Sequence, residues 1–139
     1  MTGPCPFCRI IAGQTPAATV LADDHVMAIM DRYPAAEGHV LIVSRRHHEQ
    51  LHDLDDATLT AVALASRRIA QAIRETLQPA GLRVTQANGA AAGQTVFHYH
   101  LHLLPVYPGQ GRRSHGSTAA DPARLDTLAA WLRAALPID

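Results

Sequence analysis

The stretch Val96-Phe97-His98-Tyr99-His100-Leu101-His102-Leu103-Leu104-Pro105-Val106 places a histidine at three alternate positions of a mainly apolar run. Successive side chains of a β-strand point to opposite faces of a sheet, so the run predicts a strand over 96–106 with its histidines on one face. Three imidazoles on one face are hard to explain as core filling, because each buried ring needs hydrogen-bond partners. The strand therefore predicts a functional site on one face of a sheet and packing residues on the other.

Short runs of β-branched and aliphatic residues predict the other strands of this sheet. They end at turn residues such as Asp23-Asp24 and the segment 34–38. The predicted strands cover residues 19–22, 25–30, 39–43 and 82–87. Because the early strands follow one another at hairpin spacing, we expect the sheet to be antiparallel.

Two segments have the period of an amphipathic helix. From 59 to 77 apolar residues recur at steps of three and four, and Asp53 or Asp55 can cap the start of this long helix. Asp121-Pro122 begins a shorter helix, because proline suits the first helical position. Its inward residues would be Leu125, Leu128, Leu132 and Leu136. The order of elements predicts an α+β fold: an antiparallel β-sheet with one long and one short C-terminal helix.

Length and composition predict a single domain over residues 1–139. Apolar residues make up 47% and charged residues 17% of the chain, which excludes a disordered tail or a coiled coil as the main structure. Residues 108–118 hold three glycines and two arginines without periodicity, so we expect a mobile loop over 108–120.

The charge balance argues against polyanionic partners. The chain has 12 Lys and Arg against 12 Asp and Glu, which leaves no electrostatic footprint for nucleic acid or an anionic membrane. No apolar run approaches the roughly 20 residues of a membrane span, and the first residues lack the pattern of a secretion signal. We therefore expect a cytoplasmic protein that holds any phosphate by local contacts.

The alternating histidines are consistent with two chemistries. Neutral imidazole is a common metal ligand, so the three rings could hold the catalytic metal of a metallohydrolase. Imidazole is also a nucleophile that, with an ordinary pKa of about 6.5, is largely unprotonated at neutral pH. The preceding Gly93-Gln94-Thr95 supplies an amide, a hydroxyl and a flexible glycine rather than a carboxylate. These neighbours suit a phosphate.

The only two cysteines form the motif Cys5-Pro6-Phe7-Cys8. In a reducing compartment so close a pair favours metal or redox chemistry over a structural disulfide. A tetrahedral zinc site needs four ligands, of which the motif supplies two. A thioredoxin-like pair expects a parallel βαβ context, which the residues after Cys8 do not provide. The motif alone leaves zinc, redox chemistry and free thiols open.

The run from 93 to 105 resembles the histidine triad (HIT) family, whose signature is His-x-His-x-His followed by apolar residues. The likeness extends to three other parts of the chain: residues 7–11, Asp31 and residues 38–47. It is closest to bacterial Hint-like members that carry an N-terminal Cys-x-x-Cys. The third triad position is His102, which resembles the hydrolases, whereas the related galactose-1-phosphate uridylyltransferase branch has glutamine there. The resemblance implies the HIT-like fold and a homodimer.

The resemblance also assigns roles to individual residues. His100 resembles the family nucleophile that forms a covalent nucleotidyl intermediate, and the backbone carbonyl of His98 would fix its tautomer. Asp31 matches the residue that accepts from the ribose hydroxyls, and Asn88 stands at the family's asparagine. The residues that would contact the phosphate or the leaving group are Gln94, Thr95 and His102. Those that would line the base pocket are Phe7 and Ile10.

For the cysteine pair the resemblance nominates a structural zinc site with one ion per chain. The further ligands would be His47 and His98. With four protein ligands such a site has no open position for a catalytic water. The dimer could use one face of the long helix, which carries Leu59, Val62, Ile69 and Ile73.

We therefore expect a hydrolase that cleaves at the α-phosphate of a purine nucleotide. Purine nucleoside phosphoramidates and dinucleoside polyphosphates both fit, with a nucleoside monophosphate as product. The alternative is a non-catalytic purine-nucleotide sensor or scaffold, in which turnover is incidental. The other histidines are expected to have surface or capping roles: His25, His39, His48, His52 and His115.

Overall fold

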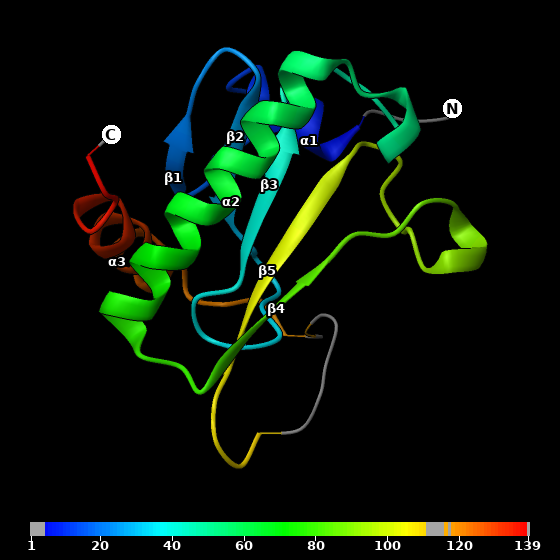
Figure 1. Cartoon of the computed structure of the whole chain (residues 1–139). Helices are drawn as coiled ribbons and strands as arrows, with labels where there is room; N and C mark the ends of the chain where they lie inside the picture. Colours follow the sequence, from blue (N-terminus) through cyan, green and yellow to red (C-terminus); the bar gives the residue numbers. More distant parts are fainter. Residues whose placement is uncertain (1–4, 111–115, 117, 139) are drawn as a thin grey trace.

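A five-stranded antiparallel sheet with the strand order β1-β2-β3-β5-β4 forms the centre of the computed structural model (Figure 1). The structure describes residues 5–110, 116 and 118–138. The strands are β1 (Thr19–Ala22), β2 (Val26–Met30), β3 (Val40–Ser44), β4 (Gly81–Thr85) and β5 (His100–Val106). Apart from the start of β5, these bounds agree with the predicted strands to within two residues.

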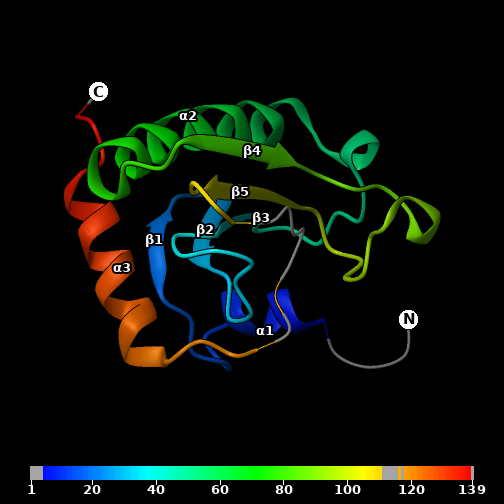
Figure 2. The same cartoon turned by 90° about the horizontal axis from the view of Figure 1, so that it is seen from below.

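Helices lie on both faces of the sheet (Figure 2). α2 (Asp56–Leu77) and α3 (Pro122–Ala134) pack against one face and against each other. The short helix α1 (Pro6–Ile11) lies on the opposite face. Two single-turn 3-10 helices cover Leu51–Asp53 and Ala90–Ala92. The predicted α+β fold is confirmed, whereas α1 was not predicted.

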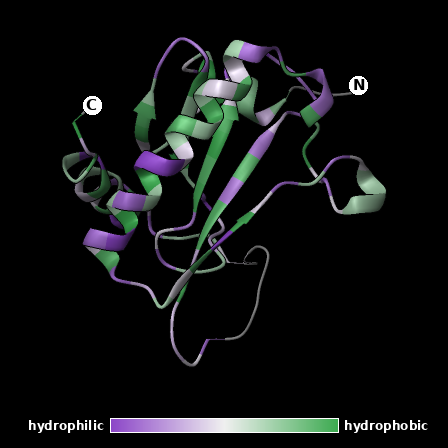
Figure 3. Ribbon diagram, in the orientation of Figure 1, coloured by the Kyte–Doolittle hydropathy of each residue, from purple (hydrophilic) through white to green (hydrophobic). Residues whose placement is uncertain are grey.

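The sheet has a separate apolar cluster on each face. The larger cluster lies under α2 and α3, and its fully buried members include Val26, Ile42, Ile69 and Leu132. The smaller cluster lies under α1 and contains Cys5, Phe7, Ile29, Leu41 and Val43. Figure 3 shows that β3 is apolar along its length, as expected for a strand covered on both faces, whereas β5 alternates. The alternation of β5 reflects its one apolar and one polar face.

The predicted dimer face of the long helix is wrong. Val62, Ile69 and Ile73 are at most 3% exposed because they face the sheet of their own chain. Leu59 is 46% exposed and does not belong to this buried face. At the helix start, Asp55 accepts a hydrogen bond from the Thr58 N–H at 2.8 Å, so Asp55 is the cap.

The last strand begins at His100 rather than at residue 96. The backbone N–H of Tyr99 donates to the His48 carbonyl at 2.6 Å instead of entering the ladder. The ring of His98 turns toward the two cysteines. These two contacts hold the chain in a bend before β5.

The predicted mobile loop falls partly on residues 111–115 and 117, which lie outside the described residues. Two described positions of this segment are bonded to the β2–β3 connection. The N–H of Gly116 donates to the Tyr33 carbonyl, and that of Ala120 donates to the Arg32 carbonyl. Within the described ranges, none of the helices has the length and hydropathy of a membrane span.

Candidate active site and metal centre

The sheet face that carries α1 is apolar on β2 and β3 and polar on β5 and β4. Ile29 of β2 pairs with Leu41 of β3. His102 of β5 pairs with Leu41 on one side and with Thr85 of β4 on the other. Paired residues of neighbouring strands point to the same face. One row across the sheet therefore runs from apolar side chains on β2 and β3 to polar ones on β5 and β4.

This face is the floor of a cleft of about 810 Å³, a volume in the range of small-molecule sites. The predicted site residues that line it are Phe7, Ile10, Asp31, Gln94, Thr95, His100 and His102. Further lining residues include Thr85, Gln86 and Ala87, at the end of β4. The cleft thus brings together most of the predicted site, but neither Asn88 nor His98 lines it.

The main chain of His98 holds the His100 ring in one tautomer. Nδ1 of His100 lies 2.7 Å from the carbonyl oxygen of His98. A carbonyl oxygen only accepts, so Nδ1 carries the proton and Nε2 keeps a lone pair. Burial, partly against the edge of the Phe7 ring, lowers the pKa of His100 below its ordinary value. His100 is therefore a neutral imidazole with an unprotonated Nε2.

His39 holds the ring of His102 in the opposite tautomer. The Ala35 N–H donates to Nδ1 of His39 at 3.1 Å, so the proton of this neutral ring sits on Nε2. Nε2 of His39 lies 2.9 Å from Nδ1 of His102 and donates to it. The proton of His102 is then on Nε2, which makes this atom a donor.

The predicted surface or capping role of His39 is wrong, because the residue is fully buried and supports the cleft. The signal that could have found it is the alternation of His39 with Leu41 and Val43 along a predicted strand. That alternation places all three on the face that carries the functional histidines.

The Asp31 carboxylate lies at the edge of the cleft, directly after β2. Its Oδ1 accepts from the Tyr33 N–H at 2.9 Å, and its Oδ2 lies 3.5 Å from Nε2 of His39. These contacts orient a group that can accept hydrogen bonds from a ligand.

Gln94 and Thr95 differ in how they meet the cleft. The buried amide of Gln94 donates to the carbonyls of Glu49 and Val96 and accepts from the Gly89 N–H at 2.7 Å. Its two N–H groups are thus used to hold the segment before β5. Thr95 is exposed and lines the cleft. The geometry gives Gln94 a supporting position and Thr95 a ligand-facing one.

Asn88 points away from the cleft and toward the start of the first 3-10 helix. Its Oδ1 accepts from the Leu51 N–H at 2.7 Å. Its amide also pairs with that of Gln86 through two hydrogen bonds of 2.8 and 2.9 Å. The part of this segment that lines the cleft is the preceding run Thr85, Gln86 and Ala87, which sequence reasoning missed.

Four side chains from distant parts of the sequence form a cluster behind the cleft. The ligand atoms of Cys5, Cys8, His47 and His98 all lie within 4.8 Å of one another. Nδ1 of His98 lies 3.3 Å from the Cys5 sulfur, and Nδ1 of His47 lies 3.2 Å from the Cys8 sulfur. In a tetrahedral zinc site, S and N ligands are about 3.5 Å apart, as bond lengths of about 2.3 and 2.0 Å require. The four residues fit one structural zinc ion.

The second ring nitrogen of His98 supports this arrangement. Nε2 lies 2.6 Å from the Ser44 carbonyl oxygen and donates to it, which leaves the lone pair on Nδ1 facing the thiols. Burial is the main cause that lowers the pKa of His98 to about 4, so the ring is neutral and able to bind a metal.

A catalytic metal held by the three triad rings does not fit this geometry. The His98 ring faces the cysteines, whereas Nδ1 of His100 faces a carbonyl. Among the described residues, none of the groups that could hold a metal contains His98, His100 and His102 together. A second group of possible metal ligands consists of Asp31, His39 and His102. The hydrogen bond between its two rings explains why these side chains lie close together.

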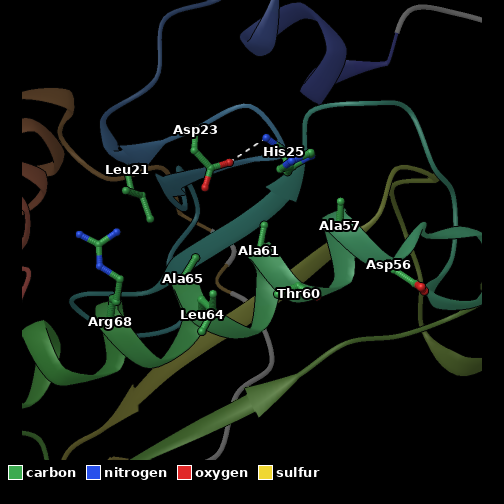
Figure 4. Close-up of a pocket in the computed structure, with 10 residues that line it drawn as sticks. All are labelled: Leu21, Asp23, His25, Asp56, Ala57, Thr60, Ala61, Leu64, Ala65 and Arg68. Carbon is green, nitrogen blue, oxygen red and sulfur yellow. Dashed lines mark hydrogen bonds between the residues drawn. The ribbon is translucent and has the colours of Figure 1, made fainter. Parts of the chain in front are cut away.

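A second hollow, of about 580 Å³, lies between α2 and the β1–β2 hairpin (Figure 4). One of its lining residues, Asp23, accepts from the N–H groups of His25 and Val26 and so holds the hairpin turn. Nη2 of Arg68 lies 3.5 Å from the Pro137 carbonyl oxygen. These polar groups stabilise the fold, so we place the functional site in the larger cleft.

The fold and the cleft define a class of protein: an antiparallel α+β domain that presents two adjacent imidazoles of opposite tautomer to a ligand-sized cleft. The chain belongs to the HIT family, because the HIT domain model matches residues 12–109. The cysteines at positions 5 and 8 match the zinc motif of the Hint-like branch that the sequence resembles.

Relatives and solved structures agree with this assignment. A protein named hit from Bacillus subtilis is 39% identical over 89% of this chain and 86% of its own. A zinc-bound histidine triad family protein from Mycobacterium smegmatis is 36% identical, with a TM-score of 0.81 over 94% of this chain and 91% of its own. A hypothetical histidine triad nucleotide-binding protein from Sulfolobus tokodaii is 27% identical, with a TM-score of 0.85 over the same shares.

The tautomers of the two cleft histidines can be read by ¹⁵N-resolved NMR of the rings. At neutral pH we expect His100 to carry its proton on Nδ1 and His102 to carry its proton on Nε2. In His39→Leu the preference of His102 should weaken, because the donor to its Nδ1 is lost. In the control His52→Leu, which changes an exposed ring, both tautomers should persist. A protonated Nδ1 on His102 in the unmodified protein would contradict the assignment.

Proposed function

We propose that the chain is a hydrolase that cleaves at the α-phosphate of a purine nucleoside phosphoramidate or dinucleoside polyphosphate. The observation that carries the proposal is the pairing of a free Nε2 lone pair on His100 with an N–H donor on His102, the ring centroids 5.1 Å apart. A neutral nucleophile can approach an anionic phosphate, and an adjacent donor stabilises the charge on its oxygens. The nucleotide-binding description of the Sulfolobus tokodaii relative supports this substrate class.

The two halves of the cleft suit the two parts of a nucleotide. Phe7 and Ile10 form an apolar wall next to Leu41, where a purine base can pack. Asp31 at the adjoining edge can accept from the ribose hydroxyls. Thr95 and His102 can donate to the phosphate oxygens.

The proposed reaction proceeds in two displacements. In the first, the Nε2 lone pair of His100 forms a bond to phosphorus, and the bond from phosphorus to the leaving group breaks. A leaving nitrogen keeps that electron pair and takes up a proton from solvent, whereas a leaving polyphosphate oxygen keeps the pair as negative charge. In the second, water attacks phosphorus, Nε2 departs with its electron pair, and the water loses a proton to solvent. The His98 carbonyl, which accepts from Nδ1, stabilises the positive charge that the ring carries between the two steps.

Replacement of the nucleophile tests this chemistry directly. We expect His100→Ala to lower kcat by roughly three orders of magnitude or more, because the variant lacks the ring proposed to form the covalent intermediate. Rapid quenching of the unmodified protein with a phosphorus-labelled substrate should trap an acid-labile adduct that is absent from His100→Ala. The exposed-site variant His52→Ala should behave like the unmodified protein. Undiminished cleavage by His100→Ala would refute the mechanism, and nucleotide binding without turnover in the unmodified protein would favour a sensor.

We also propose that Cys5, Cys8, His47 and His98 bind one zinc ion per chain. The distances within the cluster and the zinc-bound relative from Mycobacterium smegmatis support this proposal. The ion would act structurally, since four protein ligands leave no position for a substrate or catalytic water. A six-residue helix such as α1 is not stable alone. Zinc bound by Cys5 and Cys8 would therefore hold α1 in place, and with it the side chains of Phe7 and Ile10.

Metal removal should therefore weaken nucleotide binding. We expect about one zinc per chain in the native protein and almost none in Cys8→Ser. The Kd for AMP, measured by calorimetry, should rise about tenfold in Cys8→Ser and in chelated protein, with faster hydrogen exchange in residues 6–12. Zinc should restore both properties to the chelated protein and not to the variant. Equal AMP affinity with and without metal would count against a positioning role for the zinc.

We further propose a homodimer, which the family resemblance implies. β4 is an edge strand of the sheet, and Val84 within it is 55% exposed. An exposed apolar residue on a strand edge suits pairing with a second copy.

Sedimentation velocity should give the mass of a dimer for the native protein and a monomer for Val84→Lys. The reason is that a lysine in such an interface would bring two like charges together. The control Ala22→Lys changes an exposed residue of β1, the opposite edge strand, and should leave the dimer intact. A dimer that survives Val84→Lys would show that β4 is not the interface.

A further inference from the structure

The connection between β2 and β3 carries two backbone N–H groups that orient the site. The Tyr33 N–H donates to Oδ1 of Asp31 at 2.9 Å, and the Ala35 N–H donates to Nδ1 of His39 at 3.1 Å. The first contact orients the carboxylate at the edge of the cleft. The second sets the tautomer of His39 and, through it, that of His102. The position of this short stretch of main chain therefore affects both groups.

The chain after β5 holds this stretch by its carbonyl groups. The Ala120 N–H donates to the Arg32 carbonyl at 2.9 Å, and the Gly116 N–H donates to the Tyr33 carbonyl at 3.0 Å. The Arg32 carbonyl belongs to the same planar peptide unit as the Tyr33 N–H, so the two groups move together. The contact that Ala120 makes on one side of this unit thus fixes the N–H that Asp31 accepts on the other.

Gly116 also packs against the peptide unit that joins Pro34 to Ala35. A Cβ at position 116 would lie 2.8 Å from the Pro34 carbonyl carbon and closer still to the carbonyl oxygen. These are main-chain atoms, which cannot rotate away from a clash as the end of a flexible side chain can. A side chain at 116 would therefore displace the peptide unit whose N–H orients His39, or lift the 116 N–H from the Tyr33 carbonyl. Only glycine allows this close approach.

We propose that Gly116 is a positioning residue for two groups of the site, the Asp31 carboxylate and the N–H donor of His102. It acts through the main chain of residues 33–35, and the absence of a side chain is what lets it do so. The role of Asp31 as an acceptor for ribose hydroxyls rests on the proposed function. The orientation of the His102 ring can be tested without any substrate.

The variant Gly116→Ala tests the effect on His102 by ¹⁵N-resolved NMR of the ring. In the native protein the proton should sit on Nε2, whereas the variant should show a mixture of both tautomers, because the donor to His39 is displaced. The His100 ring takes its tautomer from the His98 carbonyl and should keep it. The control Gly81→Ala adds a methyl group where no described residue other than its chain neighbours lies within 4 Å. It should leave both rings as in the native protein.

The effect on Asp31 is tested by the binding of AMP and of 2′,3′-dideoxy-AMP, which lacks the ribose hydroxyls. Calorimetry should show that the native protein prefers AMP about tenfold, as expected for hydrogen bonds to a carboxylate. In Gly116→Ala this preference should fall below about threefold, because the carboxylate loses its orientation. The preference is a ratio of two Kd values, so a general loss of affinity does not change it. Gly81→Ala should keep the native ratio.

A native tautomer of His102 or a native preference for AMP in folded Gly116→Ala would overturn the inference. If Gly116→Ala does not fold, glycolic acid in place of Gly116 gives a second test. This change, introduced by ligation of a synthetic C-terminal peptide, replaces the backbone N–H by an ester oxygen and removes the donor to the Tyr33 carbonyl. It should move both readouts in the same direction, and native values would overturn the inference. A native protein without any preference for AMP would instead refute the ribose contact of the proposed function, while the His102 spectrum still decides the positioning role.

Discussion

The structure of the site depends on His98, which connects the metal cluster to the cleft. Its ring lies among Cys5, Cys8 and His47, and its other nitrogen donates to the Ser44 carbonyl. Its own carbonyl accepts from Nδ1 of His100. The contacts of the ring anchor the residue whose carbonyl sets the tautomer of His100. One residue thus contacts both the cluster and the His100 ring without lining the cleft itself.

Chemically similar rings acquire opposite roles from their hydrogen-bond partners. His100 faces a carbonyl and so keeps a lone pair on Nε2, whereas His102 accepts from His39 and so carries a proton there. Both assignments end at main-chain groups, the His98 carbonyl and the Ala35 N–H, whose donor or acceptor character cannot change. The backbone therefore determines which imidazole keeps a lone pair on Nε2 and which carries a proton there.

Sequence periodicity predicted the elements of the fold but not the contacts made outside regular elements. The strands, the long helix α2 and the shorter helix α3 were predicted because alternation and the 3.6-residue period are visible in the sequence. The helix α1 was missed because six residues carry no period, and its start depends on the Cys5 sulfur accepting from the Cys8 N–H. His39 was predicted to have a surface or capping role, because the sequence does not show that its ring is buried beside His102, 63 residues away. For Asn88, the residue type was informative but the direction of its side chain depends on Leu51, 37 residues away.

The early end of the ladder before β5 has a chemical consequence. In a regular antiparallel strand a carbonyl lies in the plane of the sheet and bonds to the neighbouring strand. A carbonyl in that position could not accept from the ring two residues ahead on the face of the sheet. The bend at 96–98, held by the Tyr99 N–H on the His48 carbonyl and by the His98 ring among the cysteines, frees this acceptor. The departure from a full strand over 96–106 thus allows the His98 carbonyl to fix the tautomer of His100 and to leave its Nε2 unprotonated.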